Sequence, residues 1–300
     1  DVRIAVLISL STQNQQQQQQ HTTRPSQLLY VHPKPTHARQ KQQQQKTRSS
    51  FSHSHTQIKN MMTSAATPIP TNVNLENLHP NLVVCPSKAF ASLFTKIRDK
   101  TTPPGEFVHY AKRIMHLLAE DALAELPTSP LTITTPCGPF VGTQSSSSSS
   151  SSSNDNELCA VSIIRAGDSL LEVMRDILPD VPVGKILIQR DESSSEKEAK
   201  LYYSKMPPHI SSKRVLLCDP MLATGGSACE ALKVLKETYG VDLENVIFVN
   251  VISCPEGLKK LAAVYPMVKI VTAWIDPILN EEKFIVPGLG DFGDRFFNTV

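Results

Sequence analysis

Short runs of Val, Ile and Leu alternate with helical segments in the second half of the chain, and this rhythm limits the folds available to it. Apolar runs without polar alternation are typical of strands buried on both faces of a sheet. Strands that alternate with helices predict an α/β fold with a parallel sheet flanked by helices. The predicted strands cover residues 159–164, 185–188, 215–218, 246–252 and 268–273, and the predicted helices cover residues 169–177, 227–239 and 256–264.

The segment before these runs predicts a helix, a hairpin and an insertion. A long helix is expected over residues 104–126, because its apolar residues recur at helical spacing after two prolines. Residues 131–135 and 140–143 flank a Pro-Cys-Gly-Pro sequence, which predicts a β-hairpin. Nine consecutive serines follow, so we expect a flexible insertion at residues 144–156.

The N-terminal region differs sharply in composition from the rest of the chain. Residues 1–70 hold two glutamine runs and few apolar residues, so we expect a disordered tail ahead of a folded domain at residues 71–300. Residues 1–60 contain eight basic side chains and one acidic, although the whole chain has a formal net charge of only +2. The basicity therefore belongs to the tail, and we expect neither nucleic acid nor a membrane as a partner.

The six cysteines and nine histidines predict neither a disulfide scaffold nor a zinc site. No C-x-x-C pair is present, and the histidines outside the tail lack metal-ligand spacing. The simplest compartment for such a protein is the reducing cytoplasm.

A glycine-rich turn follows the predicted strand at residues 215–218 and leads into a predicted helix. Adjacent glycines allow a tight turn, and a helix N-terminus attracts anions, so this corner favours a phosphate group. The carboxylate at its start repels phosphate and suits hydroxyl groups or a metal ion. A sugar phosphate would suit both the turn, through its phosphate, and the carboxylate, through its hydroxyl groups. The plainer alternative is an ordinary strand-turn-helix corner with no ligand. The motif consists of Asp219, Pro220, Met221, Leu222, Ala223, Thr224, Gly225, Gly226 and Ser227.

Two arginines follow two other predicted strands. Arg165 comes directly after the strand at residues 159–164, and Arg190 follows the strand at residues 185–188. The carboxyl ends of parallel strands gather at one edge of a sheet, where ligands bind. Since arginine suits bidentate contacts to phosphate oxygens, a pyrophosphate is the expected guest, and the alternative for either residue is a surface ion pair.

A second glycine-rich segment, residues 284–295, lies near the C-terminus. Its backbone N–H and C=O groups could match the donors and acceptors of a pyrimidine ring, with Asp291 near the reacting centre. The alternative is a structural turn with solvated carboxylates. No G-x-x-x-x-G-K-[ST] motif is present, and no G-x-G-x-x-G follows a predicted strand, which disfavours P-loop kinases and dinucleotide-binding proteins.

Taken in order along the chain, these motifs resemble those of uracil phosphoribosyltransferases, a type I phosphoribosyltransferase family. The resemblance covers about residue 74 to the C-terminus. It rests on Arg165-Ala166-Gly167, Arg190-Asp191-Glu192, residues 202–207, the Asp219 to Ser227 segment, Pro255-Glu256-Gly257 and residues 285–295. Val173 departs from it, because the family usually has glycine in the helix after Arg165.

The resemblance implies a reaction, uracil plus phosphoribosyl pyrophosphate giving UMP and pyrophosphate, and it implies a role for each motif. Asp219 would hold the ribose hydroxyls, residues 223–227 the 5′-phosphate, and Arg165 and Arg190 the pyrophosphate. Uracil would be contacted by Ile285, Gly290 and Phe292, largely through backbone groups, with Asp291 beside the reacting end. The segment at residues 202–207 would belong to a small hood or arm over the substrates.

The resemblance also implies Mg²⁺ as the cofactor, a homodimer or larger assembly, and GTP as an effector to be tested. One alternative function stays open, a catalytically silent relative that serves as a regulatory or assembly module. The retained Arg165, Arg190, Asp219 and Asp291 argue against it.

Overall fold

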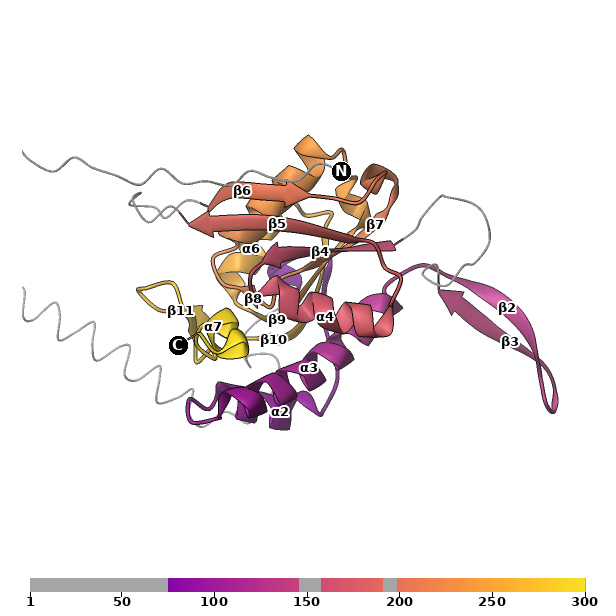
Figure 1. Cartoon of the computed structure of the whole chain (residues 1–300), viewed down its shortest axis with the longest axis horizontal. Coiled ribbons are helices and arrows are strands. Elements are labelled where there is room, and N and C mark those ends of the chain that lie inside the picture. The colour runs from indigo at the N-terminus through magenta and orange to yellow at the C-terminus, as the bar shows by residue number, and fades with distance from the viewer. Residues whose placement is uncertain (1–74, 146–157, 191–198, 300) are drawn as a thin grey trace, which may run out of the picture. The chain divides into compact units, whose positions relative to one another are not determined.

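The structure, a computed structural model, describes residues 75–145, 158–190 and 199–299 (Figure 1). The tail predicted at residues 1–70 and most of the insertion predicted at residues 144–156 lie outside the described residues. Residues 144 and 145, which we expected in the insertion, belong instead to the strand β3. The predicted domain boundary at residue 71 remains a prediction.

A mixed, mostly parallel sheet forms the centre of the fold. Neighbouring strands pair in parallel except at one edge, where β6 pairs with β5 in the antiparallel direction. β8 (Met221–Leu222) pairs with β9 beside this path. In spatial order the strands are β1 (Leu82–Val84), β10 (Lys269–Ile275), β9 (Val246–Ser253), β7 (Arg214–Cys218), β4 (Leu158–Ile164), β5 (Val183–Arg190) and β6 (Ala199–Lys205).

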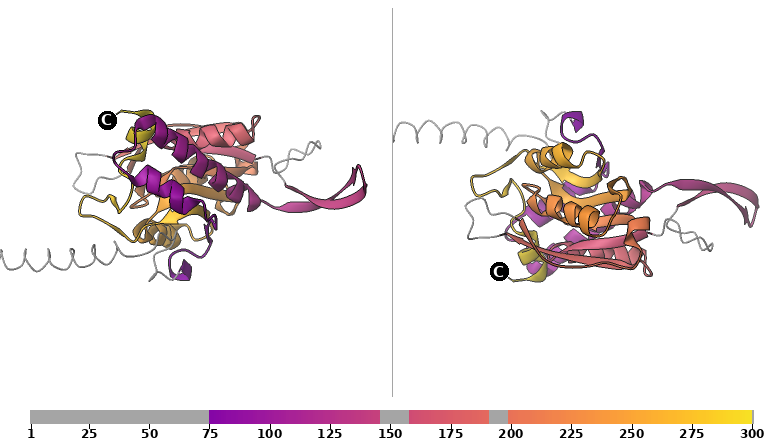
Figure 2. Two further views of the ribbon diagram at one scale, coloured as in Figure 1. Left: turned by 90° about the horizontal axis from the view of Figure 1, so that it is seen from below. Right: turned by 90° about the horizontal axis from the view of Figure 1, so that it is seen from above.

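Helices cover both faces of this sheet, as Figure 2 shows from opposite sides. One face packs against α2 (Phe90–Arg98), α3 (Pro104–Ala124), α4 (Gly167–Ile177) and α7 (Phe292–Phe297). The other face packs against α5 (Gly226–Lys233), its π-helical continuation (Val234–Thr238) and α6 (Pro255–Val264).

Strand β7 illustrates why two separate cores form. Leu216 and Cys218 join the core beneath α2, α3 and α4, whereas Val215 and Leu217 join the core beneath α5 and α6. All four side chains are fully buried. Successive side chains of a strand point to opposite faces, so an unbroken apolar run is what a sheet covered on both sides requires. The predicted α/β architecture is confirmed.

Most predicted elements are present, with small shifts at their ends. The helix predicted over residues 104–126 ends at Ala124, and Val173, the departure noted above, is fully buried on the inner side of α4. The sequence did not reveal β1, which has three residues, or α2, whose N-cap residue Ala89 makes no side-chain capping bond. Neither element carries a start signal that could be recognised.

The predicted hairpin is longer than expected and projects from the body of the fold (Figure 1). Strands β2 (Thr128–Thr135) and β3 (Gly138–Ser145) form a separate two-stranded sheet. Its apolar side chains are exposed, including Phe140 and Val141 at 56% and 65%. An apolar ribbon of this kind is poorly suited to exist alone in water.

The remaining elements are short and connect the main ones. They are the 3₁₀ helices η1 (Leu75–Asn77), η3 (Ile210–Ser212) and η5 (Leu243–Asn245), and the paired strands β11 (Ile278–Leu279) and β12 (Ile285–Val286). Within the described ranges, no helix has both the length and the apolar character needed to cross a membrane.

Candidate active site

The segment predicted to bind phosphate, residues 219–227 and called the phosphate loop below, follows β7, contains β8 and ends in the first two residues of α5. Gly225 has a φ of 76°, a conformation that glycine adopts without strain, and α5 begins at the next residue. The first turn of α5 therefore presents backbone N–H groups at the loop, as an anion requires. Asp219 is half-buried at the end of β7, and its Oδ1 accepts a hydrogen bond of 3.3 Å from the Met221 N–H.

The phosphate loop is held in place by close backbone packing against the start of α6. A Cβ atom on Gly257 would lie 2.6 Å from the Ala223 carbonyl oxygen, so only glycine fits there. Cys254 donates its N–H to the Leu222 carbonyl at 3.0 Å and its Sγ–H to the Ala223 carbonyl, also at 3.0 Å. Burial raises the pKa of the Cys254 thiol to about 12, which keeps the thiol protonated as a donor.

The loop that carries Arg165 is packed directly against the phosphate loop. A Cβ atom on Gly167 would lie 2.3 Å from the carbonyl oxygen of Cys218, the residue before Asp219. Two polar side chains fix this loop: Ser162 Oγ donates to Asp168 Oδ1 at 2.6 Å, and Lys185 Nζ donates to Asp168 Oδ2 at 3.1 Å. The sequence did not single out Asp168 or Lys185.

The guanidinium of Arg165 points toward the C-terminal segment. It forms an ion pair with Asp294, donates to Thr299 Oγ1 at 3.0 Å, and lies 5.9 Å from the Phe297 ring. Thr299 Oγ1 also donates to Asp294 Oδ1 at 2.7 Å. The hydrogen bonds from Thr299 and Arg165 lower the pKa of Asp294. Arg165 therefore has a carboxylate partner in this structure.

The segment predicted to contact the base, residues 285–291 and called the base loop below, consists of β12 and the turn that leads into α7. Gly290 and Asp291 are exposed, whereas the Ile285 and Phe292 side chains are buried in the core. Burial of both side chains is consistent with the prediction that these residues contact a ligand largely through their backbone groups, which remains a prediction. The expected loop at residues 284–295 is partly helical, because Asp291 Oδ1 caps α7 by accepting the Asp294 N–H at 2.9 Å.

One exclusion made from the sequence needs correction. Residues 288–293 read G-x-G-x-x-G, follow the strand β12 and lead into α7. However, β12 has two residues and pairs antiparallel with β11. A dinucleotide fingerprint requires a parallel βαβ unit, so the segment still does not support dinucleotide binding.

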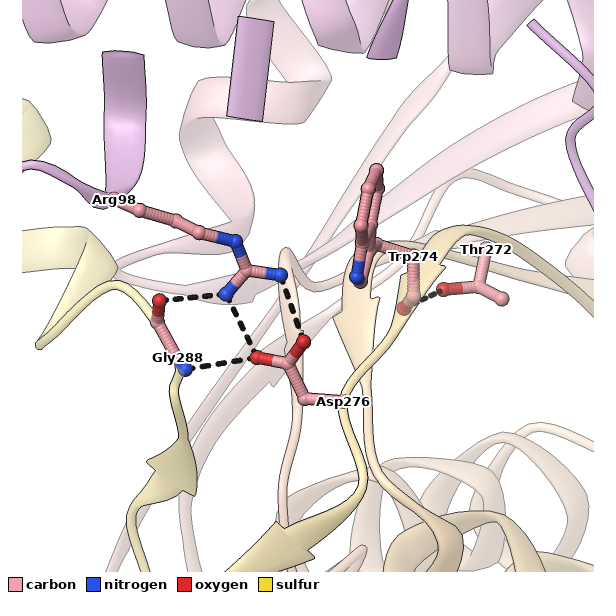
Figure 3. Close-up of polar contacts among 5 residues, drawn as sticks. All are labelled: Arg98, Thr272, Trp274, Asp276 and Gly288. Atoms are coloured by element: carbon pink, nitrogen blue, oxygen red, sulfur yellow. Dashed lines mark hydrogen bonds and ion pairs between the residues drawn. The ribbon is translucent and has the colours of Figure 1, made fainter. Parts of the chain in front are cut away.

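A buried ion pair holds the base loop from behind (Figure 3). Arg98, the last residue of α2, donates to both carboxylate oxygens of Asp276 at 2.7 and 2.8 Å and to the Gly288 carbonyl at 2.7 Å. Asp276 also accepts the Gly288 N–H at 2.8 Å. The Arg98 guanidinium lies 5.4 Å from the Trp274 ring. Sequence reasoning missed this pair, although Asp276 follows the strand β10 directly, the same signal that identified Asp219.

A second arginine supports the next peptide of the base loop. Arg295 Nη1 donates to the Leu289 carbonyl at 2.6 Å, and Nη2 donates to the Asp99 carbonyl at 2.7 Å. Its guanidinium lies 4.3 Å from the Phe107 ring.

Beside the Arg98 and Arg295 guanidinium groups lies a pocket of about 380 Å³, and none of its lining residues belongs to the phosphate loop. The pocket is lined by Arg98, Lys100, Thr102, Pro104, Phe107, Pro287, Leu289, Gly290 and Arg295.

The structure brings most of the predicted site residues to one edge of the sheet. A Cβ atom on Gly293 would lie 3.6 Å from Arg165 Nη2 and 3.5 Å from Ala166 Cβ, which places the Arg165 loop beside α7, the helix that follows the base loop. Together with the contact between Gly167 and Cys218, this places the three predicted substrate segments side by side. Arg190 is the last residue of β5, and its backbone pairs with Ala199 of β6.

The predicted arm begins as an ordered edge strand. Tyr202 and Tyr203 lie in β6, which pairs with β5, and both side chains are exposed. A Cβ atom on Gly226 would lie 3.9 Å from Ala199 Cβ, so the start of β6 adjoins the phosphate loop. The residues between β5 and β6 lie outside the described ranges.

Comparisons with known proteins indicate which family the chain belongs to. The uracil phosphoribosyltransferase family model matches residues 84–299. A Dictyostelium discoideum uracil phosphoribosyltransferase is 45% identical over 221 residues, which cover 73% of this chain and 97% of that protein. Uracil phosphoribosyltransferase 1 of Schizosaccharomyces pombe is 46% identical over 207 residues, covering 69% and 90%. A solved Aquifex aeolicus structure has a TM-score of 0.60 at 30% identity, covering 72% of this chain and 97% of that one.

Proposed function

The chain belongs to the uracil phosphoribosyltransferase family, and from this premise we propose that it transfers the 5-phosphoribosyl group of phosphoribosyl pyrophosphate to N1 of uracil. The products are UMP and pyrophosphate, and the reaction is a step of pyrimidine salvage. One observation supports this most strongly: the Arg165 loop and the α4 residue that follows it lie beside the end of β7, where the phosphate loop begins, and beside α7, into which the base loop leads.

The binding roles follow from the chemistry of each segment. The N–H groups of residues 223–227 would hold the 5′-phosphate at the start of α5, and Asp219 would accept hydrogen bonds from the ribose hydroxyls. Arg165 and Arg190 would bind the pyrophosphate. Bond breaking at the anomeric carbon leaves positive charge on the sugar and negative charge on the leaving group. Catalysis therefore comes from charge stabilisation and from orientation of N1, and no covalent nucleophile is required.

The donor chemistry of this edge fits magnesium held mainly by substrate. Among the described residues no group of three or more His, Cys, Asp or Glu side chains could hold a metal ion. Mg²⁺ usually keeps several waters and binds one or two carboxylates together with substrate phosphates. Asp219 would therefore hold it only together with substrate oxygens, and bound magnesium would neutralise charge on the departing pyrophosphate.

The base would lie against the backbone of Ile285, Gly290 and Phe292, with Asp291 at its reacting end. Backbone groups suit this task because a pyrimidine ring presents fixed donors and acceptors along its edge. β6 and the segment before it would cover the substrates during the reaction. Covering the site excludes water, which otherwise could hydrolyse the activated sugar.

We further propose a homodimer or larger assembly in the cytoplasm, with GTP as an effector to be tested by activation assays. The exposed apolar hairpin formed by β2 and β3 supports an assembly, because a second copy of the chain could cover Phe140 and Val141. All six cysteines are free thiols, which supports a reducing compartment. Light scattering of the purified protein measures the assembly state directly.

An assay with labelled uracil tests the proposed reaction against the silent-module alternative. Purified protein with Mg²⁺ and phosphoribosyl pyrophosphate should form labelled UMP, whereas cytosine, orotate and adenine should be poorer substrates. Asp219→Asn and Arg190→Ala should each lower the rate by at least about tenfold, which corresponds to about 1.4 kcal/mol of barrier. Absence of UMP in the unmodified protein would favour the silent module. Full activity in both variants would refute the site assignment.

A further inference from the structure

Two successive carbonyl groups of the base loop accept hydrogen bonds from arginine side chains on the same side of the loop. Arg98 Nη1 donates to the Gly288 carbonyl at 2.7 Å, and Arg295 Nη1 donates to the Leu289 carbonyl at 2.6 Å. The N–H of Gly288 donates a hydrogen bond to Asp276 Oδ2 at 2.8 Å. The polar groups of this stretch that face α2 are therefore satisfied by side chains.

Peptide geometry fixes where the remaining donors of this stretch point. The peptide bonds after Gly288 and Leu289 are trans, since the cis bonds of the described residues lie elsewhere. In a planar trans peptide the N–H points opposite to the carbonyl. The N–H groups of Leu289 and Gly290 are therefore directed away from the two arginines. Within the described ranges neither N–H has a hydrogen-bond partner, and Gly290 is exposed.

The arginines themselves cannot turn away easily. Asp276 is only 2% exposed and binds both terminal nitrogens of Arg98 (Figure 3). The Arg98 guanidinium also lies 5.2 Å from the Phe94 ring and 5.4 Å from the Trp274 ring. Bidentate pairing fixes the plane of a guanidinium as well as its position. Arg295 is fixed in a similar way between Phe107 and the Asp99 carbonyl.

We propose that Arg98, Asp276 and Arg295 are positioning residues that set the base preference of the enzyme. By holding the Gly288 and Leu289 carbonyls, they aim two N–H donors at the edge of the pyrimidine ring. N–H donors at this position can form hydrogen bonds with the carbonyl oxygen of uracil. Cytosine is disfavoured because it presents an amino group, itself a donor, at the equivalent ring position. The inference rests on the proposed function, because it assigns the base to this loop.

Conservative variants separate this role from a merely structural one. Arg98→Lys keeps the charge and loses the bidentate contact, and Asp276→Asn keeps the shape and loses the charge. Arg295→Lys keeps the charge and loses the planar fork that donates to the Leu289, Ile97 and Asp99 carbonyls. We expect each variant to raise KM for uracil by about tenfold or more and to weaken discrimination against cytosine, because hydrogen-bond selection depends on fixed donors. KM for phosphoribosyl pyrophosphate should stay within about twofold.

A matched control is Arg175→Lys, because Arg175 is an exposed residue of α4, away from the base loop. It should leave both KM values unchanged. An unchanged KM for uracil in all three variants would overturn the proposal. So would a parallel rise in both KM values together with a lower melting temperature, because that pattern indicates general destabilisation.

Hydrogen exchange on the unmodified protein tests the same inference if the variants do not fold. Bound UMP should slow exchange of the Leu289 and Gly290 amides as well as that of residues 223–227. Protection of the phosphate loop without protection of Leu289 and Gly290 would overturn the positioning role and leave the proposed function intact. Protection of neither segment would reject the proposed function, and the inference with it.

Discussion

The phosphate loop and the base loop reach their shapes by different means. The phosphate loop is a continuous strand-turn-helix segment, and its backbone is held by the N–H and the thiol of Cys254 and by close packing against Gly257. The base loop is held by side chains from distant parts of the chain, because Arg98 lies 190 residues before Gly288. A binding site can therefore be half encoded in a local motif and half encoded in long-range contacts.

Of the changes that test the difference between the two loops, breaking the Arg98–Asp276 pair should have the largest effect, a loss of folding stability. Arg98→Met leaves the Asp276 carboxylate buried without its cationic partner, and removing one partner of a buried pair typically costs about 3–5 kcal/mol. We expect the free energy of unfolding, measured by urea denaturation, to fall by about that amount.

Lys269→Met is the matched control for this prediction. Lys269 pairs with Glu125 at 2.7 Å, but both side chains are about one-third exposed. Its loss should cost about 1 kcal/mol or less. Equal losses in the two variants would show that the Arg98 contact has no special weight in the fold.

A side chain added where α6 packs against the phosphate loop should lower the activity of the enzyme. Gly257→Ala places a Cβ atom 2.6 Å from the Ala223 carbonyl, so the loop must shift. Because a displacement of about 1 Å can cost about 100-fold in rate, we expect a fall of that order in kcat/KM for phosphoribosyl pyrophosphate.

Gly105→Ala controls for the added methyl group, because a Cβ atom on Gly105 meets no atom within 4 Å. This variant should keep full activity. A Gly257→Ala enzyme with unchanged kcat/KM would show that the phosphate loop tolerates movement, contrary to its tight packing.

A smaller effect is expected at Arg165, which lies between the two loops in the proposed site. Asp294 of α7 pairs with Arg165, so pyrophosphate bound at Arg165 would compete with a carboxylate. The lowered pKa of Asp294 means that this competition operates at neutral pH and is lost only when the pH falls below the usual carboxyl range. Asp294→Asn should therefore tighten pyrophosphate binding by about threefold in calorimetric titrations at pH 7.5. Weaker binding would indicate that Asp294 helps to orient Arg165.

The smallest effect is expected for chemical labelling of Cys254, whose thiol donates to the phosphate loop. Burial raises the pKa of Cys254, so very little thiolate forms at pH 8, whereas Cys137 is exposed in the hairpin. Iodoacetamide at pH 8 should label Cys137 and leave activity unchanged. Rapid labelling of Cys254 with loss of activity would show that the loop opens readily.

The contrast between the loops also explains how much the sequence could predict. Most of the parallel sheet, most of its helices and the turn at residues 219–227 were predicted because each depends on a local pattern: buried strands are continuous apolar runs, and the turn needs a glycine at Gly225, where φ is 76°. The roles of Arg98 and Asp276 were not predicted, because an ion pair between residues 178 apart leaves no periodic signal. α2 was missed because it starts without a capping side chain, and α7 was hidden within a segment that its glycines made resemble a loop.

A crystal structure with UMP tests the account most directly, because one molecule spans both loops. We predict the 5′-phosphate at the N–H groups of residues 223–227, the ribose hydroxyls at Asp219, and the base against the backbone of Gly290 with a ring carbonyl facing its N–H. UMP bound elsewhere, or a base turned away from the loop supported by Arg98 and Arg295, would contradict the account.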